Sequence, residues 1–108
     1  MHTFIESPIF TQYWPDYWTE DERGEFAAFL AANPKAGVVI PGAAPLRKVR
    51  WKRQGTGKSG GVRVIYTTRL TKGAVVALTL YGKSAVDNIP AHILRQLAKE
   101  FGDENEDD

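Results

Sequence analysis

The chain contains no cysteine among its 108 residues. Disulfides, thiolate metal ligands and a cysteine nucleophile are therefore excluded. Histidine is also scarce: the two present, His2 and His92, lie far apart in the sequence, so a histidine-based zinc site is not indicated. His92 is expected to be a surface residue rather than a catalyst. No apolar run approaches the roughly 18 residues of a membrane-spanning helix, so we expect a cytoplasmic protein.

Acidic residues are absent from the whole middle of the chain. No Asp or Glu occurs between Glu25 and Asp87, and this stretch holds 11 of the 14 Lys and Arg residues. The formal net charge of +1 thus hides a basic middle and two acidic flanks. Such a basic block is typical of a surface that binds a polyanion. The alternative is an ordinary solvated surface whose acids fall elsewhere. Because hard cations need oxygen ligands, the lack of acids argues against a metal site.

Length and composition indicate one folded domain. A chain of this size has room for a single modest core. A hydrophobic content of 43%, with three Trp, four Tyr and five Phe, argues against disorder. We expect the domain to span residues 1–102. Residues 103–108 form an acidic tail that is expected to be disordered.

Three helices are expected. The clearest starts at Thr19, because TEDE forms a capping box there, and it ends at the Asn-Pro dipeptide 33–34. Before it, the aromatic segment 10–18 allows only a short helix, since Pro15 limits its length. A third helix is expected over about residues 89–101, and its apolar stripe suits a core better than a partner groove. The predicted buried stripes are Phe26, Phe29 and Leu30 in the helix after Thr19, and Ile89, Ile93, Leu94, Leu97 and Phe101 in the last helix.

Four strands are expected from the alternation of apolar and polar residues, over residues 3–7, 46–51, 62–69 and 74–81. The Gly- and Pro-rich segment 35–45 is expected to be a loop with one short extended piece at most. The order strand, helix, helix, strand, strand, strand, helix predicts an α+β fold. In this fold a small antiparallel sheet has helices packed on one face.

Strand alternation also sorts the side chains into two faces. Apolar residues are expected to face the helices: Val49, Trp51, Val62, Val64, Val76, Leu78 and Leu80. The opposite face is then expected to carry Lys48, Arg50, Arg63, Val75, Ala77, Thr79 and Tyr81. Tyr66 and Trp51 point to the core by parity, so Tyr81 is the better candidate for contact with a base or a ribose. This cation-rich face predicts an anion site.

The predicted ligand is a phosphodiester backbone rather than a small phosphate, because the cations are spread over two strands and a loop. The Gly-rich loop with Lys52, Arg53 and Lys58 can fold over the cation-rich face. Lys83 follows the end of the third of these strands, beside Tyr81. The segment GTGKS resembles part of a P-loop, but the required earlier glycine is missing and a strand follows where that motif needs a helix. Nucleotide hydrolysis is therefore not predicted.

A cluster of cations with a tyrosine could cleave RNA without a metal or a histidine. The ribose 2′-hydroxyl can attack its adjacent phosphate, and the protein then has to orient it and neutralise the transition state. Arg50 and Arg63 suit that neutralisation, because guanidinium groups bind phosphate oxygens bidentately. A Lys or Tyr crowded by other cations could serve as general base.

Three segments together resemble a known family: LRKVRW (46–51), GKSGGVRVIY (57–66) and LTLYGKSAVDNIP (78–90). The combination closely resembles the RelE/HigB-type toxins of bacterial type II toxin–antitoxin systems, and most closely the HigB-like branch. The resemblance covers roughly residues 19–101. It implies a small antiparallel sheet with two N-terminal helices and one C-terminal helix.

The resemblance also implies an activity and partners. The activity is that of a ribosome-dependent endoribonuclease that cuts mRNA in the ribosomal A site, with no cofactor. The implied partner is an antitoxin, usually a helix-turn-helix DNA-binding protein. The alternative is a non-catalytic RNA- or ribosome-binding module that uses the same basic face.

Site residues carry over from the family position by position. The family's strand pair of cations is similar to Lys48 and Arg50, and its strand arginine is similar to Arg63. In the RelE branch an arginine stands where this chain has Ser84, and a tyrosine aligns near Pro90, so we expect Tyr81 and Lys83 to replace them. The candidate catalytic residues are Arg50, Lys58, Arg63, Tyr81 and Lys83, and the candidate RNA-binding residues are Lys48, Lys52 and Arg53.

Overall fold

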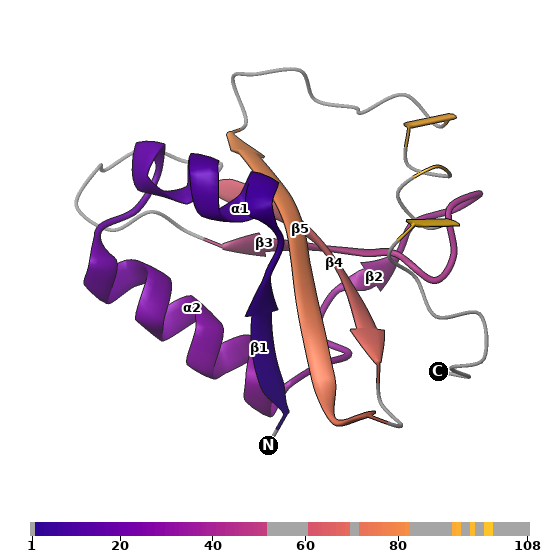
Figure 1. Ribbon diagram of the computed structural model, residues 1–108, viewed down its shortest axis with the longest axis horizontal. Helices are drawn as coiled ribbons and strands as arrows, with labels where there is room; N and C mark the ends of the chain where they lie inside the picture. Colours follow the sequence, from indigo (N-terminus) through magenta and orange to yellow (C-terminus); the bar gives the residue numbers. More distant parts are fainter. Residues whose placement is uncertain are drawn as a thin grey trace.

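The computed structural model describes residues 2–51, 61–69 and 72–82, together with positions 92, 93, 96, 99 and 100. A five-stranded sheet forms one layer, and two helices lie on one of its faces (Figure 1). The helices are α1 (Pro8–Tyr13) and α2 (Glu20–Ala32), joined through the 3-10 turn η1 (Trp14–Asp16). The strands are β1 (Thr3–Glu6), β2 (Val38–Val39), β3 (Arg47–Trp51), β4 (Val62–Arg69) and β5 (Ala74–Gly82). The predicted α+β class is confirmed.

The sheet is mixed rather than antiparallel throughout. Its strand order is β1-β5-β4-β3-β2. β5, β4 and β3 pair antiparallel, as expected, and β2 also pairs antiparallel with β3. β1 instead pairs in parallel with β5, with Thr3 opposite Ala74 and Glu6 opposite Ala77. The expectation of an all-antiparallel sheet was therefore wrong at this edge. Alternation within a strand predicts its faces but not its neighbour, which depends on the path of the helices across the sheet.

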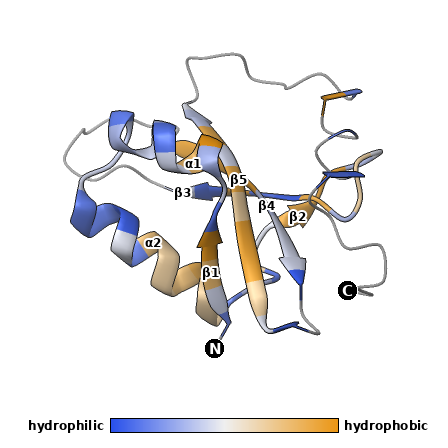
Figure 2. Cartoon of the chain, in the orientation of Figure 1, coloured by the Kyte–Doolittle hydropathy of each residue, from blue (hydrophilic) through white to orange (hydrophobic). Residues whose placement is uncertain are grey.

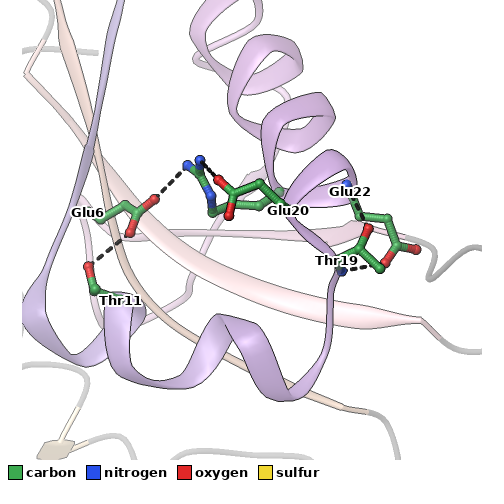
Figure 3. A network of polar contacts seen from close by, with 6 residues as sticks. Glu6, Thr11, Thr19, Glu20 and Glu22 are labelled. Carbon is green, nitrogen blue, oxygen red and sulfur yellow. Dashed lines mark hydrogen bonds and ion pairs between the residues drawn. The ribbon is translucent and has the colours of Figure 1, made fainter.

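The start of α2 follows from its capping box. The Thr19 hydroxyl accepts a hydrogen bond from the Glu22 amide at 3.2 Å, and the Thr19 amide donates to the Glu22 carboxylate at 2.8 Å (Figure 3). The short helix lies earlier than expected: α1 begins at Pro8, with Ser7 as N-cap, and Pro15 lies within η1. The short extended piece expected in the loop is β2.

The predicted C-terminal helix can be checked at five positions. Residues 92, 93, 96, 99 and 100 are helical, as expected. His92 is exposed, and Ile93, which was predicted to lie in the buried stripe, is 39% exposed. The other predicted members of that stripe, Ile89, Leu94, Leu97 and Phe101, lie outside the described residues, as does the tail 103–108.

The main core fills the space between the helices and the sheet. Phe10 of α1 and Phe26 of α2 are fully buried there, with Trp18 between them, and their rings make edge-on and tilted contacts. On the sheet side this core contains Val62, Val64, Tyr66, Val75, Ala77 and Leu80. β5 is hydrophobic over most of its length, whereas β3 is largely hydrophilic (Figure 2). Because the helices cover one face of the central strands, only the opposite face of these strands can carry a site on the sheet.

The opposite face of the sheet also has a buried apolar cluster. It consists of Ala43, Leu46, Ile65, Val76 and Leu78, with Ile40 and Tyr81 packed against it. Val76 and Leu78 were predicted to face the helices, and Val75 and Ala77 to face away; all four assignments were wrong. The reason is a register shift, in which Ile65 pairs with Thr79 but Tyr66 pairs with Ala77. The extra residue in β5 reverses its alternation, so only the assignments of Thr79, Leu80 and Tyr81 hold.

Candidate nucleic-acid interface

The sheet face that α1 and α2 do not cover brings the described candidate residues together. We call it the outer face and define it by Lys48, Arg50, Arg63, Ile65, Thr79 and Tyr81. On β3, Lys48 and Arg50 are exposed and alternate with the half-buried Val49 and Trp51. On β4, Arg63 alternates with Val62 and Val64, which belong to the helix-side core. The predicted placement of Lys48, Arg50, Arg63, Thr79 and Tyr81 on one face is thus reproduced.

Three of these residues form a row across the sheet. Arg50 of β3 lies directly opposite Arg63 of β4, and Arg63 lies directly opposite Tyr81 of β5. Directly paired side chains in an antiparallel sheet have Cβ atoms about 4.5–5.5 Å apart. Two guanidinium groups and a phenol can therefore meet at one ligand. We call these three residues the Arg50–Arg63–Tyr81 row.

The two ends of the row differ in their surroundings. Arg50 is exposed, whereas Arg63 and Tyr81 are half-buried, and Tyr81 packs against the apolar cluster of this face. Ile65, only 1% exposed, lies opposite both Lys48 and Thr79 and forms an apolar floor next to the row. A half-buried phenol has fewer accessible rotamers than an exposed one. The row therefore has a partly buried phenol at one end and an exposed cation at the other.

The charged side chains that define the outer face, Lys48, Arg50 and Arg63, are all cations. Like charges directly opposite each other in a sheet are destabilising, and Arg50 and Arg63 are such a pair. Among the residues of the five strands the only acid is Glu6, and its neighbours lie on the helix side. A bound phosphate would relieve the repulsion, because each guanidinium can donate two hydrogen bonds to its oxygens.

The described acids nearest the sheet are used in packing the helices. Arg23 of α2 forms ion pairs with Glu6 of β1 at 2.9 Å and with Glu20 at 2.6 Å, and the Thr11 hydroxyl donates to Glu6 (Figure 3). The hydrogen bond that Arg23 donates to the Glu20 carboxylate raises the pKa of Arg23 above its ordinary value; burial opposes this, and the charge of Glu6 adds to it. The Arg23 guanidinium also lies 5.1 Å from the centre of the Trp14 ring.

Two aromatic residues that were assigned to the core do lie there. Tyr66 is fully buried, and its hydroxyl donates to the Pro34 carbonyl at 2.9 Å and accepts from the Gly37 amide at 2.8 Å. Trp51 packs against the ring of Phe26, with centroids 5.4 Å apart, and against Phe29 at 5.0 Å. Neither ring is therefore offered to a ligand on the outer face.

Four predicted site residues lie outside the described residues: Lys52, Arg53, Lys58 and Lys83. The cation Arg47, also on β3, is half-buried, and its guanidinium donates to the Gly37 carbonyl at 2.7 Å. It alternates away from Lys48 and does not join the outer face. The residue that the sequence interpretation missed is Ser7, whose hydroxyl reaches β5. Its only sequence signal is a serine before a proline, which indicates a helix start.

Away from the outer face, the described residues form a pocket, but no cluster of metal ligands and no membrane-spanning helix. A pocket of about 510 Å³ is lined by His2, Phe29, Asn33, Pro34, Lys35 and Ala36. None of these residues belongs to the outer face. In the described part of the chain, no three His, Asp or Glu side chains are grouped so as to hold a metal ion. Nor is any described helix long and apolar enough to cross a membrane.

Two solved structures share this architecture at low sequence identity. One is a chain of the intact E. coli RelBE toxin–antitoxin complex, with a TM-score of 0.58 and 15% identity, covering 78% of this chain and 98% of that one. The other is the isolated E. coli RelE toxin, with a TM-score of 0.58 and 12% identity, covering 93% of this chain and 98% of that one. No protein-family model matches the chain. Neither structure bears on the HigB-like branch. What they establish is the fold: the chain has the α+β fold of the RelE toxin.

Proposed function

We propose that this chain is the toxin of a type II toxin–antitoxin system and acts as a ribosome-dependent mRNA endoribonuclease of the HigB-like branch. The observation that supports the proposal best is the Arg50–Arg63–Tyr81 row, which puts two guanidinium groups and a phenol side by side on a sheet face where the described residues include no acid. The likeness in fold to the RelE toxin supports the same class. Such a toxin would act in the cytoplasm, where it meets ribosomes.

The row suits cleavage by the ribose 2′-hydroxyl. The 2′-oxygen attacks the adjacent phosphorus, its proton passes to a base, and the bond from phosphorus to the 5′-oxygen breaks as that oxygen takes up a proton. The products are a 2′,3′-cyclic phosphate and a 5′-hydroxyl end. Arg50 and Arg63 would neutralise the charge on the pentacoordinate transition state. Tyr81, next to Arg63, is placed to transfer a proton, and Lys58 and Lys83 are the other candidates for this step.

Binding and positioning of the message would come from the remaining cations. Lys48 is exposed beside the row on β3, and Lys52 and Arg53 directly follow that strand in the sequence. Contacts to phosphates from such residues hold an RNA backbone without reading its sequence. The ribosomal A site would supply the orientation of the mRNA that so small a site lacks. No metal and no cofactor take part in this scheme.

A cognate antitoxin is part of the proposal. One of the two structures with this fold is a chain of a toxin–antitoxin complex. From the family resemblance, we propose a helix-turn-helix antitoxin that neutralises this chain and represses their common operon. An adjacent reading frame for a small helix-turn-helix protein would support this directly.

The second candidate function is a non-catalytic RNA- or ribosome-binding module. It is favoured by Ser84 and Pro90, which stand where the RelE branch has an arginine and a tyrosine. The same outer face would bind phosphates in both cases. The two candidates differ in whether the RNA backbone is cut.

Mapping of mRNA ends on programmed ribosomes tests the proposal. Wild-type chain is expected to produce discrete new 5′ ends in primer extension. Arg63→Ala is expected to reduce cleavage about 100-fold, as for loss of one preorganised donor to the transition state. Tyr81→Phe is expected to reduce it by about 100-fold or more, if the phenol transfers a proton. Lys35→Ala, which removes an exposed cation that does not belong to the outer face, is the matched control.

Three outcomes separate the candidates. Cleavage that depends on Arg63 and Tyr81 supports the nuclease. Salt-dependent binding to ribosomes or RNA, with no cut by the wild-type chain, supports the binding module. A wild-type chain that neither binds nor cuts overturns both.

A further inference from the structure

β5 reverses its alternation at Leu78. Val75, Ala77 and Leu80 all belong to the helix-side core. Leu80 follows Ala77 by three positions, an odd number, whereas residues on one face of a regular strand are an even number of positions apart. Leu78 lies in the apolar cluster of the opposite face. In the pairing with β4, the step from Ile65 to Tyr66 corresponds to the step from Thr79 to Ala77, so Leu78 has no residue opposite it. Leu78 is therefore the extra residue of a β-bulge.

The bulge decides where Tyr81 points. Successive side chains of an unbroken strand alternate between faces. If β5 continued without the extra residue, Thr79 and Tyr81 would follow Val75 and Ala77 to the helix side. The extra residue instead puts Tyr81 opposite Arg63 on the outer face. The Arg50–Arg63–Tyr81 row exists only because of the bulge.

Ser7 holds the bulge through two consecutive carbonyls. Its amide donates to the Ala77 carbonyl at 3.0 Å, and its hydroxyl donates to the Leu78 carbonyl at 2.7 Å. A bulged residue is left outside the ladder, so its polar groups need other partners. Ser7 is only 6% exposed, so water has little access to replace this donor. The contact joins positions that are 71 residues apart in the sequence.

The same hydroxyl also starts α1. It accepts a hydrogen bond from the Phe10 amide at 3.1 Å, and Phe10 is fully buried in the core. A serine hydroxyl has one proton to donate and two lone pairs to accept with, so both contacts can exist together. The cap needs only the acceptor, whereas the bulge needs the donor. The two roles can therefore be separated by mutation.

We propose that Ser7 is a positioning residue for Tyr81, acting through the bulge at Leu78. The expected effect of Ser7 on RNA cleavage rests on the proposed nuclease function, whereas its expected effect on the register of β5 does not. Without the hydroxyl, the Leu78 carbonyl loses its donor and β5 shifts toward the regular register. Thr79 and Tyr81 then leave their partners Ile65 and Arg63.

Four variants test the proposal in the full-length protein. Ser7→Ala removes both contacts. Ser7→Asp keeps an oxygen that can accept from the Phe10 amide but has no proton to donate at neutral pH. Ser7→Thr keeps the hydroxyl. Thr19→Ala is the matched control. It also removes an N-cap hydroxyl, but the Thr19 hydroxyl bonds to the Glu22 amide of α2 and not to β5.

The first measurement is the register of β5 by cross-strand nuclear Overhauser effects in NMR spectra. Ser7→Ala and Ser7→Asp are expected to lose the contacts between Thr79 and Ile65 and between Tyr81 and Arg63, while keeping those between Ala77 and Tyr66. Thr19→Ala and Ser7→Thr are expected to retain all of them. If Ser7→Asp keeps the wild-type register, Ser7 is only a helix cap and the proposal is wrong. Should Ser7→Ala fail to fold, Ser7→Asp decides.

The second measurement is mRNA cleavage on programmed ribosomes. Ser7→Ala is expected to reduce cleavage by about 100-fold, as much as Tyr81→Phe, because Tyr81 leaves its place beside Arg63. In the background of Tyr81→Phe the same change is expected to cost less than about twofold, because residues that act through one another are not additive. Equal losses in both backgrounds would overturn the link to Tyr81.

The two proposals can fail separately. If the wild-type chain cuts no RNA, the proposed nuclease function fails while the register measurement still decides the role of Ser7. If the wild-type chain cuts RNA and Ser7→Ala changes neither register nor cleavage, the nuclease stands and Ser7 has no positioning role.

Discussion

Arg50 on β3 lies directly opposite Arg63 on β4 in the register of the sheet, so two residues of like charge are paired on its outer face. Like charges directly opposite each other destabilise a sheet, and a phosphate bound between them would offset this repulsion. The same pair that opposes folding would then favour binding of a phosphodiester. Removing one charge of the pair should therefore raise stability and weaken binding, whereas on a surface that only contacts solvent it would not weaken binding.

Arg50→Gln is expected to have opposite effects on folding and on binding. The free energy of unfolding should rise by about 0.2–1 kcal/mol at low salt, because the like-charged pair is removed. Binding to single-stranded RNA should weaken, and the slope of log K against log salt should fall by about 0.7, the loss of one phosphate contact. Urea unfolding and a salt titration of RNA binding measure the two effects. Lys35→Gln is the control and should change neither. A loss of stability in Arg50→Gln would contradict the prediction.

Tyr66→Phe is expected to lower the free energy of unfolding by about 1–3 kcal/mol, because the Gly37 amide loses its buried acceptor and the Pro34 carbonyl loses a donor. Tyr13→Phe is the matched control: Tyr13 is 44% exposed on α1, and its change should stay within about 0.5 kcal/mol. Thermal or urea unfolding measures both. Equal small effects would mean that water replaces the lost hydroxyl.

Two glycine substitutions are expected to act in opposite directions. A Cβ on Gly37 would lie 2.8 Å from the Lys48 carbonyl oxygen and 2.9 Å from the Tyr66 ring, so Gly37→Ala should destabilise by about 1–3 kcal/mol. A Cβ on Gly24 meets nothing within 4 Å, and Gly24 lies in the interior of α2. Gly24→Ala should therefore stabilise by about 0.5–1 kcal/mol. Midpoints of urea unfolding compare the pair, and a tolerated Gly37→Ala would show that β3 can move away.

Glu6→Gln is expected to lower the free energy of unfolding by about 0.2–1 kcal/mol, because Arg23 loses its ion pair with β1. The loss should shrink as salt is added, since the pair is only partly buried. Glu25→Gln, an exposed position of α2, is the control and should be neutral. Unfolding curves at low and high salt test this. A salt-independent loss would point to packing rather than charge.

Local chemistry let the sequence predict most single elements. The capping box at Thr19, the extent of β3 to β5 within about a residue, and the grouping of Lys48, Arg50 and Arg63 all follow from side-chain type and alternation. These signals act within one strand or one helical turn. The structure tests neither the roles of these residues nor the positions of Lys52, Arg53, Lys58 and Lys83, which lie outside the described residues.

Only the tertiary structure decided the features that join distant parts of the chain. The parallel pairing of β1 with β5 and the bulge at Leu78 have no local sequence signal, because each depends on a partner many residues away. The sequence interpretation placed Tyr81 correctly but from a wrong alternation, which put Val75 and Ala77 on the outer face. By itself the sequence determined that the strands β3 to β5 carry cations and no acids. The bulge at Leu78 decided that Tyr81 joins their outer face, because a one-residue change of register turns every following side chain to the other face.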